Sequence, residues 1–373
     1  MGSRSSSDGK REVFGAKSAA LGADRVDAGD SEENPGVSAI VPCRNEARHV
    51  ERFLADLAPW GHDGFPFEVI VADGRSDDGT REILDQFARS HAWLRVIDNP
   101  ARFIPNGLNR AAAEASHEIV LRLDVHTRYD RDYARVSREV LLASGAQNVG
   151  GPWRAVGDTI QGRVIADVFQ HPKVFGAAQS RNVAHEGPVD TVYLGCWWRD
   201  YLVSIGGFDE RCVHNEDNEL NRRIRSLGGT VWQSPRIRSE YDVPVEVRKY
   251  AWQWAQNGYW GAHTISIHRD GVSSRHRFSM ALLTALLLLA VAGLFVTPVR
   301  WGLLSVGASY LAFALFVGAS LARVRSWWMW PLYVWVVVAT HVFWAAGFGA
   351  GLVDFLLLGD RGMFRNTFAR LIR

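Results

Sequence analysis

Short apolar runs alternate with amphipathic segments through the first third of the chain. Four runs rich in aliphatic and β-branched residues are typical of strands, at residues 37–41, 67–72, 94–97 and 118–123. Helical spacing of apolar positions separates them, at residues 46–57, 83–88 and 106–115. Strands that alternate with helices of about 10–15 residues indicate βαβ units and a parallel sheet. The pattern therefore predicts an α/β domain with a Rossmann-like, mainly parallel sheet.

The pattern changes after Arg277. Three long stretches without Asp, Glu, Lys or Arg follow, at residues 278–299, 301–322 and 326–353. Each exceeds the roughly 18–20 apolar residues that a helix needs to cross a bilayer. We expect a transmembrane region of about three spans over residues 278–358 and a basic tail at 359–373. A buried core helix is the alternative for any one stretch.

Basic residues around these stretches suggest an orientation. Arg275 and Arg277 precede the first stretch, and Arg323 and Arg325 separate the second from the third. Because positive charge favours the cytoplasmic side, we expect an integral protein of the plasma or inner membrane with its N-terminal domain in the cytoplasm. The arginines after residue 360 would prefer the same side, which three crossings do not allow. The glycine-rich third stretch could also bend back as a re-entrant hairpin, so the side of the C-terminus stays open.

Composition indicates the character of the N-terminal segment, the class of partner and the state of the cysteines. Residues 1–36 are rich in Gly, Ser, Asp and Arg and contain no apolar block, which predicts a disordered tail and no signal peptide. The formal net charge of +2 gives no indication of a nucleic-acid partner. The three cysteines, Cys43, Cys196 and Cys212, follow no metal-binding spacing. They are typical of semi-buried thiols in a reducing compartment.

Two possible metal ligands follow the fourth predicted strand. Asp124 and His126 are alternate residues, and in an extended segment alternate side chains point the same way. A carboxylate and an imidazole on one side can share a Mg²⁺ or Mn²⁺ ion. A structural role for the histidine is the alternative. The sequence predicts a divalent metal site at the carboxyl end of this strand, where open α/β sheets bind ligands.

Other acidic residues have a chemical and a structural interpretation. Glu216 and Asp217 could supply a general base, or could stabilise the start of the helix that contains Leu220. Asp73 follows the second predicted strand and could contact a base or ribose, although Asp also favours turns. Glu46 could bind a ligand or interact with a helix dipole. The sequence alone leaves these alternatives open.

Several segments together resemble the family 2 glycosyltransferases of the GT-A fold. The similarity is carried by residues 37–46, 71–80, 122–126, 189–195, 206–210 and 215–223. It covers about residues 37–270 and is nearest to the succinoglycan-type membrane glucosyltransferases. The resemblance implies a GT-A domain at 37–245, an amphipathic membrane-interface region at 246–277, and the C-terminal transmembrane helices.

The resemblance also implies roles for individual residues. Asp124 and His126 occupy the metal-binding position, with His replacing a second Asp, and Asp217 beside Glu216 matches the catalytic base. The nucleotide-sugar donor would contact Pro42, Glu46, Asp73, Asn109, Arg122 and Gly195. The acceptor or its pocket would involve Trp197, Trp198, Gln253 and Trp260. No Arg stands directly before Trp260, which weakens any case for processive polymer synthesis.

The function so implied is inverting transfer of a sugar, most simply from a UDP-sugar, to a polyprenyl-linked saccharide or lipid. The product would enter cell-surface polysaccharide or glycolipid synthesis. One alternative is a polyprenyl-phosphate sugar synthase, in which a phosphate attacks and no base is needed. The other is a catalytically silent membrane scaffold that binds nucleotide sugars. The sequence does not predict the sugar, the linkage or the oligomeric state.

Overall fold

The computed structural model describes residues 34–62, 64–175, 178–244, 246–267, 285, 289, 292–358 and 363–368. Positions 1–33 of the predicted tail lie outside the described residues. Positions 34–36, assigned to that tail from sequence, pack on the domain: Arg138 donates hydrogen bonds to Asn34 Oδ1 and to the Pro35 carbonyl, each at 2.8 Å. The folded domain therefore includes these three residues.

The α/β domain is built on an eight-stranded sheet with the order β3-β2-β1-β4-β9-β6-β10-β8. Its strands are β1 (Val37–Cys43), β2 (Phe67–Asp73), β3 (Leu94–Asp98), β4 (Ile119–Arg122), β6 (Asn148–Gly151), β8 (Gly187–Pro188), β9 (Tyr193–Trp198) and β10 (Val231–Gln233). Strands β1 to β4 pair in parallel, whereas β9 is antiparallel to β4 and β6. The predicted α/β class and its first four strands are confirmed.

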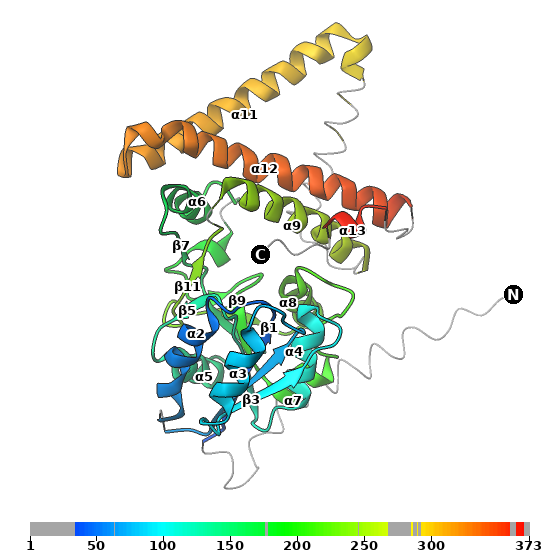
Figure 1. Ribbon diagram of the computed structural model, residues 1–373. Helices are drawn as coiled ribbons and strands as arrows, with labels where there is room; N and C mark the ends of the chain where they lie inside the picture. The colour runs from blue at the N-terminus through cyan, green and yellow to red at the C-terminus, as the bar shows by residue number, and fades with distance from the viewer. Residues whose placement is uncertain are drawn as a thin grey trace, which may run out of the picture.

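Helices cover both faces of this sheet (Figure 1). They are α2 (Val50–Leu57), which continues as a 3₁₀ turn (Ala58–His62), α3 (Thr80–Ala88), α4 (Ile104–Ala113), α5 (Tyr133–Ser144), α6 (Ile160–Gln170), α7 (Arg199–Ser204) and α8 (Glu216–Ser226), with a further 3₁₀ turn at Gln179–Arg181. The side chains of alternate residues in β1 lie on opposite faces of the sheet. Val41 packs in the core that contains α2, whereas Ile40 packs in the core that contains α4 and α8.

A small second sheet extends the domain towards the C-terminal helices. It consists of β5 (Thr127–Tyr129), β11 (Ser239–Asp242) and β7 (Ala155–Val156), in the order β5-β11-β7. Its register places Tyr241 opposite Thr127, the residue that follows His126. This pairing brings a distant part of the chain to the predicted metal site.

The C-terminal part is helical. It comprises α9 (Val247–Ile267), α11 (Thr297–Val324), a 3₁₀ turn (Trp327–Met329), α12 (Trp330–Leu352), a π-helical turn (Val353–Leu357) and α13 (Arg365–Phe368). Two segments, Thr297–Val324 and Trp327–Leu357, are long and apolar enough to cross a membrane. Most of the predicted first span lies outside the described residues. Its last residues belong to α11, so Arg300 does not mark a helix boundary.

Helix α9 lies along α12 above the α/β domain (Figure 1). Their contact, here named the α9–α12 seam, is made where Gly258 meets Trp344, and where Gly347 and Gly351 meet Ala255 and Tyr259. A Cβ at any of these glycines would overlap a carbonyl oxygen of the facing helix. The glycines therefore permit close helix packing. They do not bend α12, which is continuous to Leu352, so the re-entrant alternative is wrong for this segment.

Candidate active site

The carboxyl ends of β1, β2 and β4 meet at one edge of the main sheet. Cys43 and Asp73 end β1 and β2 side by side, and β4 ends at Arg122. Ligands bind at this edge in open α/β sheets. The start of α8 reaches the same edge from far along the chain, because Arg122 pairs with Glu216.

Four charged residues gather there: Arg122, Asp124, Glu216 and Asp217, here named the charge cluster. The Arg122 side chain is buried, with its Nε 3.2 Å from Asp124 Oδ1 and an Nη 2.9 Å from Glu216 Oε1. Glu216 is buried as well. Burying charged groups is costly unless they are paired. The sequence therefore retains a group of charges that contributes little to stability, which is a feature of functional sites.

Electrostatics distinguish the members of the charge cluster. Burial raises the pKa of Glu216 and the pKa of Asp217, and the Arg122 guanidinium opposes that rise in both. Burial lowers the pKa of Arg122, but the charges of Asp124, Glu216 and Asp217 outweigh it and raise that pKa overall. A carboxylate with a raised pKa accepts a proton more readily than a free one, as a general base requires.

The segment of the predicted metal ligands is a turn and not an extended strand. Strand β4 ends at Arg122, and the Thr127 amide donates a hydrogen bond to the Asp124 carbonyl at 3.1 Å. The Tyr129 hydroxyl fixes this turn, because it accepts from the Asp124 amide at 2.7 Å and donates to the Asp124 carbonyl at 3.1 Å. The expectation that Asp124 and His126 are alternate residues of an extended segment was therefore wrong, and their shared role as metal ligands stays a prediction.

His126 lies beside groups from two other segments. Its Nδ1 is 3.7 Å from Glu46 Oε1, and its ring meets the edge of the Tyr241 ring at 6.3 Å between centroids. The Tyr241 hydroxyl in turn accepts a hydrogen bond from Gln253 of α9 at 2.9 Å. The structure thus links three residues for which the sequence predicted different roles. Glu46, a predicted donor contact, lies beside His126, a predicted metal ligand, and Tyr241 connects His126 to Gln253, a predicted acceptor contact.

The residues fit a divalent metal that is held partly by substrate. Among the described residues, no group of three or more His, Cys, Asp or Glu side chains could hold a metal ion alone. Mg²⁺ sites on nucleotides commonly use only one or two carboxylates, with substrate phosphates completing the shell. Asp124 lies at the ligand-binding edge and is partly exposed, and His126 is exposed enough to reach a ligand. This donor set suits a metal–diphosphate complex better than a resident metal.

The other predicted donor contacts lie at strand ends or are already engaged. Pro42 is in β1 opposite Ala72. Asp73 is almost fully buried, and its Oδ1 accepts a 2.6 Å hydrogen bond from the Ser76 hydroxyl. Arg81 lies 3.8 Å from its other oxygen. The turn that follows β2 is thus organised around Asp73, which agrees with the structural interpretation and leaves its donor role a prediction.

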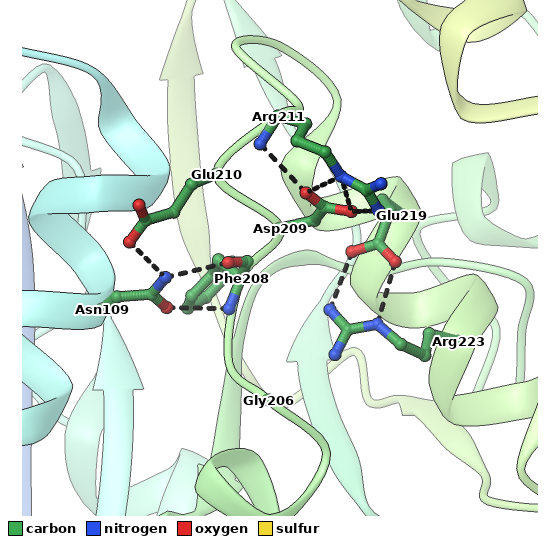
Figure 2. Close-up of a pocket in the computed structure, with 8 residues that line it drawn as sticks. All are labelled: Asn109, Gly206, Phe208, Asp209, Glu210, Arg211, Glu219 and Arg223. Carbon is green, nitrogen blue, oxygen red and sulfur yellow. Dashed lines mark hydrogen bonds and ion pairs between the residues drawn. The ribbon is translucent and has the colours of Figure 1, made fainter. Parts of the chain in front are cut away.

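Asn109 lines a pocket of about 440 Å³ whose lining contains no residue of the charge cluster (Figure 2). It accepts a 2.8 Å hydrogen bond from the Phe208 amide and donates one of 2.8 Å to the Phe208 carbonyl. On the other side of the pocket, Glu219 and Arg223 of α8 pair, and Arg223 donates to the Gly207 carbonyl at 2.6 Å. These contacts hold the loop that leads to α8.

The predicted tryptophans do not gather at the site: Trp197 and Trp260 are buried in cores, and Trp198 lies opposite Ile119, at the start of β4 and away from its carboxyl end. Trp197 is 1% exposed and packs against Phe208, as a core residue does. Trp260 is equally buried, and its Nε1 donates to the Phe368 carbonyl at 3.2 Å. Trp198 is half-buried at the end of β9. Gly195 has a φ of 140°, and a side chain there would overlap the Trp197 ring.

Sequence reasoning missed Tyr129 and Tyr241, which support Asp124 and His126. Neither belongs to a motif, and their contacts depend on the pairing of β5 with β11. The available signal was the short Thr127–Tyr129 strand directly after the predicted ligands. The three cysteines are free and buried, as expected.

The chain is similar in sequence to known glycosyltransferases and polysaccharide biosynthesis proteins. Residues 38–200 match the family model for glycosyl transferase family 2. The succinoglycan biosynthesis protein ExoA of Rhizobium meliloti is 29% identical over 338 residues, which cover 85% of this chain and 94% of that protein. The poly-beta-1,6-N-acetyl-D-glucosamine synthase of Staphylococcus epidermidis is 29% identical over 232 residues, or 60% of this chain and 55% of the synthase.

Among solved structures, the mannosyltransferase PcManGT from Pyrobaculum calidifontis, in complex with GDP-Man and Mn²⁺, has a similar fold. The TM-score is 0.55 at 20% sequence identity, over 90% of this chain and 94% of the mannosyltransferase. At that identity, the comparison concerns the architecture.

Proposed function

The chain carries a family 2 glycosyltransferase domain of GT-A architecture, and from this premise we propose that it is a membrane-anchored, inverting transferase. Its donor is a nucleoside diphosphate sugar, with UDP-sugars the first to test. Its acceptor is a polyprenyl-linked saccharide or lipid presented at the cytoplasmic face. The similarity to a succinoglycan biosynthesis protein supports a place in cell-surface polysaccharide or glycolipid synthesis.

The charge cluster is the observation that carries this proposal. It puts Asp124, a candidate metal ligand, and Asp217, a candidate base, around one buried guanidinium at the ligand-binding edge. Inverting transfer needs both functions close together: a carboxylate to take the proton of the attacking hydroxyl, and positive charge at the departing diphosphate. Asp217 is the base, because it is the more exposed of the acidic pair. Glu216 is engaged with Arg122.

Asp124 and His126 would hold a Mn²⁺ or Mg²⁺ ion, which neutralises the diphosphate leaving group when bound. The remaining roles belong to the chain. Glu46 orients His126, Arg122 keeps the charge cluster in place, and Glu46 and Asp73 lie where the nucleoside would enter.

Nucleoside diphosphate release from a panel of sugar nucleotides tests the function. Detergent-purified protein is assayed with Mn²⁺, with and without a lipid extract, and Asp217→Asn serves as the blank. Lipid-stimulated release from one donor, reduced about 10²- to 10⁴-fold in the variant, is the expected result, since a positioned base contributes about that much. Full release by the variant would favour a phosphate acceptor, which needs no base. Binding without release from any donor would favour a silent scaffold.

A further inference from the structure

The residue before the acidic pair has an unusual backbone conformation. Asn215 is the N-cap of α8, and its φ of 63° lies in the left-handed region. Most residues adopt this conformation only at an energetic cost, and Asn tolerates it better than others. Glu216 and Asp217 follow directly. The direction in which these carboxylates enter the site therefore depends on the backbone at Asn215.

The Asn215 side chain ties this backbone to a different part of the molecule. Its Nδ2 donates a hydrogen bond to the Asn257 carbonyl of α9 at 3.2 Å, and its Oδ1 accepts one from the Asn218 side chain at 3.4 Å. A helix carbonyl has a second lone pair available for such a bond. The contact therefore joins the first turn of α8 to the middle of α9.

The Asn257 carbonyl is itself held in place by the α9–α12 seam. Gly258, the next residue, packs directly on the Trp344 carbonyl of α12. Hydrogen bonds hold α9 on both sides of this point: the Tyr250 hydroxyl and the Thr340 hydroxyl of α12 are bonded at 2.9 Å, and Tyr259 donates to Asp354 in the π-helical turn after α12 at 2.6 Å. The acceptor for Asn215 is thus part of a rigid helix pair that includes a candidate membrane span.

Such an anchor is needed because like charges surround Asp217. Asp124 and Glu216 are both close enough to influence this region electrostatically, and Arg122 is the cation that opposes them. The Asn215 hydrogen bond restrains the first turn of α8 against this repulsion, in addition to the Arg122–Glu216 ion pair.

We propose that Asn215 is a positioning residue that fixes Asp217 relative to Asp124 by anchoring the start of α8 to α9. The placement of the base is thereby set by the α9–α12 seam. The assignment rests on the proposed function for the role of Asp217 alone. Asn215 itself touches neither substrate nor metal.

Two substitutions isolate the amide. Asn215→Gly keeps the left-handed backbone without strain but removes the side chain, and Asn215→Asp keeps the shape but replaces the donor with an oxygen facing the Asn257 carbonyl. Both are expected to lower kcat about 10- to 100-fold with the donor KM unchanged, because a displacement of about 1 Å can cost about a hundredfold in rate. Ser226→Ala, at the other end of α8, is the control and keeps wild-type kcat. Hydrogen exchange of the first turn of α8 should rise in both Asn215 variants and not in Ser226→Ala.

The link to the seam is tested with two glycines of α9. Gly258→Ala places a methyl against the Trp344 carbonyl, whereas Gly261→Ala meets nothing within 4 Å. Only the first should lower kcat. Combined with Asn215→Gly, it should lower kcat by less than the product of the two separate effects, since both act on one contact.

Different failures have different meanings. Wild-type kcat in both Asn215 variants, or a multiplicative double variant, overturns the positioning role. A change in thermal stability alone, with kcat per folded molecule kept, also overturns it. Absence of turnover in the wild-type protein with every donor defeats the proposed function instead. Hydrogen exchange then decides the anchor, and unchanged first-turn exchange in Asn215→Gly overturns it.

Discussion

The charge cluster and the α9–α12 seam are both tightly packed, but they are held in opposite ways. The charge cluster buries Arg122 between two carboxylates, and its geometry depends on charge. The seam brings two helix backbones together at glycines and depends on the absence of side chains. Buried ion pairs contribute little net stability, whereas close packing contributes much. Substitutions in the first region should therefore act mainly on chemistry and donor binding. Those in the second should act mainly on stability, and also on kcat at Gly258, next to the carbonyl that anchors Asn215.

The sharpest test of this contrast is Asp124→Ala. Removing one of two proposed protein ligands should weaken Mn²⁺-dependent donor binding by about 100-fold or more, because few protein groups support the ion. Thermal stability should change much less, since the buried Arg122 keeps Glu216 as an ion-pair partner at 2.9 Å. Calorimetric titration with a nucleoside diphosphate and Mn²⁺ measures the effect. Asp200→Asn on the exposed surface of α7 is a suitable control. An unchanged Mn²⁺-dependent affinity would rule out Asp124 as a ligand.

The opposite outcome is expected in the seam. Gly347→Ala forces a methyl onto the Ala255 carbonyl and should destabilise the protein by about 1–3 kcal/mol, the usual cost of overpacking. Gly307→Ala in α11 meets nothing within 4 Å. It should be neutral or stabilising by up to about 1 kcal/mol, because Ala is the better helix former. Thermal unfolding in detergent compares the two. Equal stability of both variants would show that the seam does not hold α9 on α12.

The pH dependence of kcat probes the charge cluster more finely. Arg122 opposes the rise in the pKa of Glu216 and of Asp217, so removing its charge in Arg122→Met should raise the pKa of both further. A base must be deprotonated to act, so the acid limb of kcat should move to higher pH. Arg122→Lys keeps a positive charge and should leave the limb nearer its wild-type position. A limb that does not move in Arg122→Met would separate Arg122 from the base.

The same contrast explains what the sequence could predict. Strands β1 to β4, with Asp73, Asp124 and the acidic pair beyond them, follow from apolar periodicity and motif order. Each of these features depends on a local segment, so the residue types and spacing within that segment are enough to predict it. Long apolar runs likewise predicted α11 and α12, although not the position where α11 begins.

The remainder depends on contacts between distant segments. The turn at Asp124 is fixed by Tyr129, and Tyr241 reaches His126 only because β11 pairs with β5. Asn109 was predicted to contact the donor, yet its side chain accepts a hydrogen bond from the Phe208 backbone amide. Glycines 347 and 351 permit either bending or close packing, and only the facing backbone of α9 decides between them. Periodicity contains no information about these partners.

The smallest expected effect on donor binding is at Tyr129, a residue that contributes both to core packing and to the support of Asp124. This tyrosine is half-buried and packs on Tyr133 and Trp60 of the core, yet its hydroxyl makes both hydrogen bonds to the Asp124 backbone. Tyr129→Phe keeps the packing and leaves the Asp124 amide without its partner, which should cost about 1–3 kcal/mol of stability. Donor affinity should fall by less than tenfold, because the Asp124 carboxylate itself is retained while its support is loosened, an effect smaller than the roughly 10- to 100-fold typical of a supporting group. Unfolding and Mn²⁺-dependent donor titration on the same sample separate the two effects. Full donor affinity at reduced stability would show that Tyr129 serves only the fold, and that the turn at Asp124 is held by its neighbours.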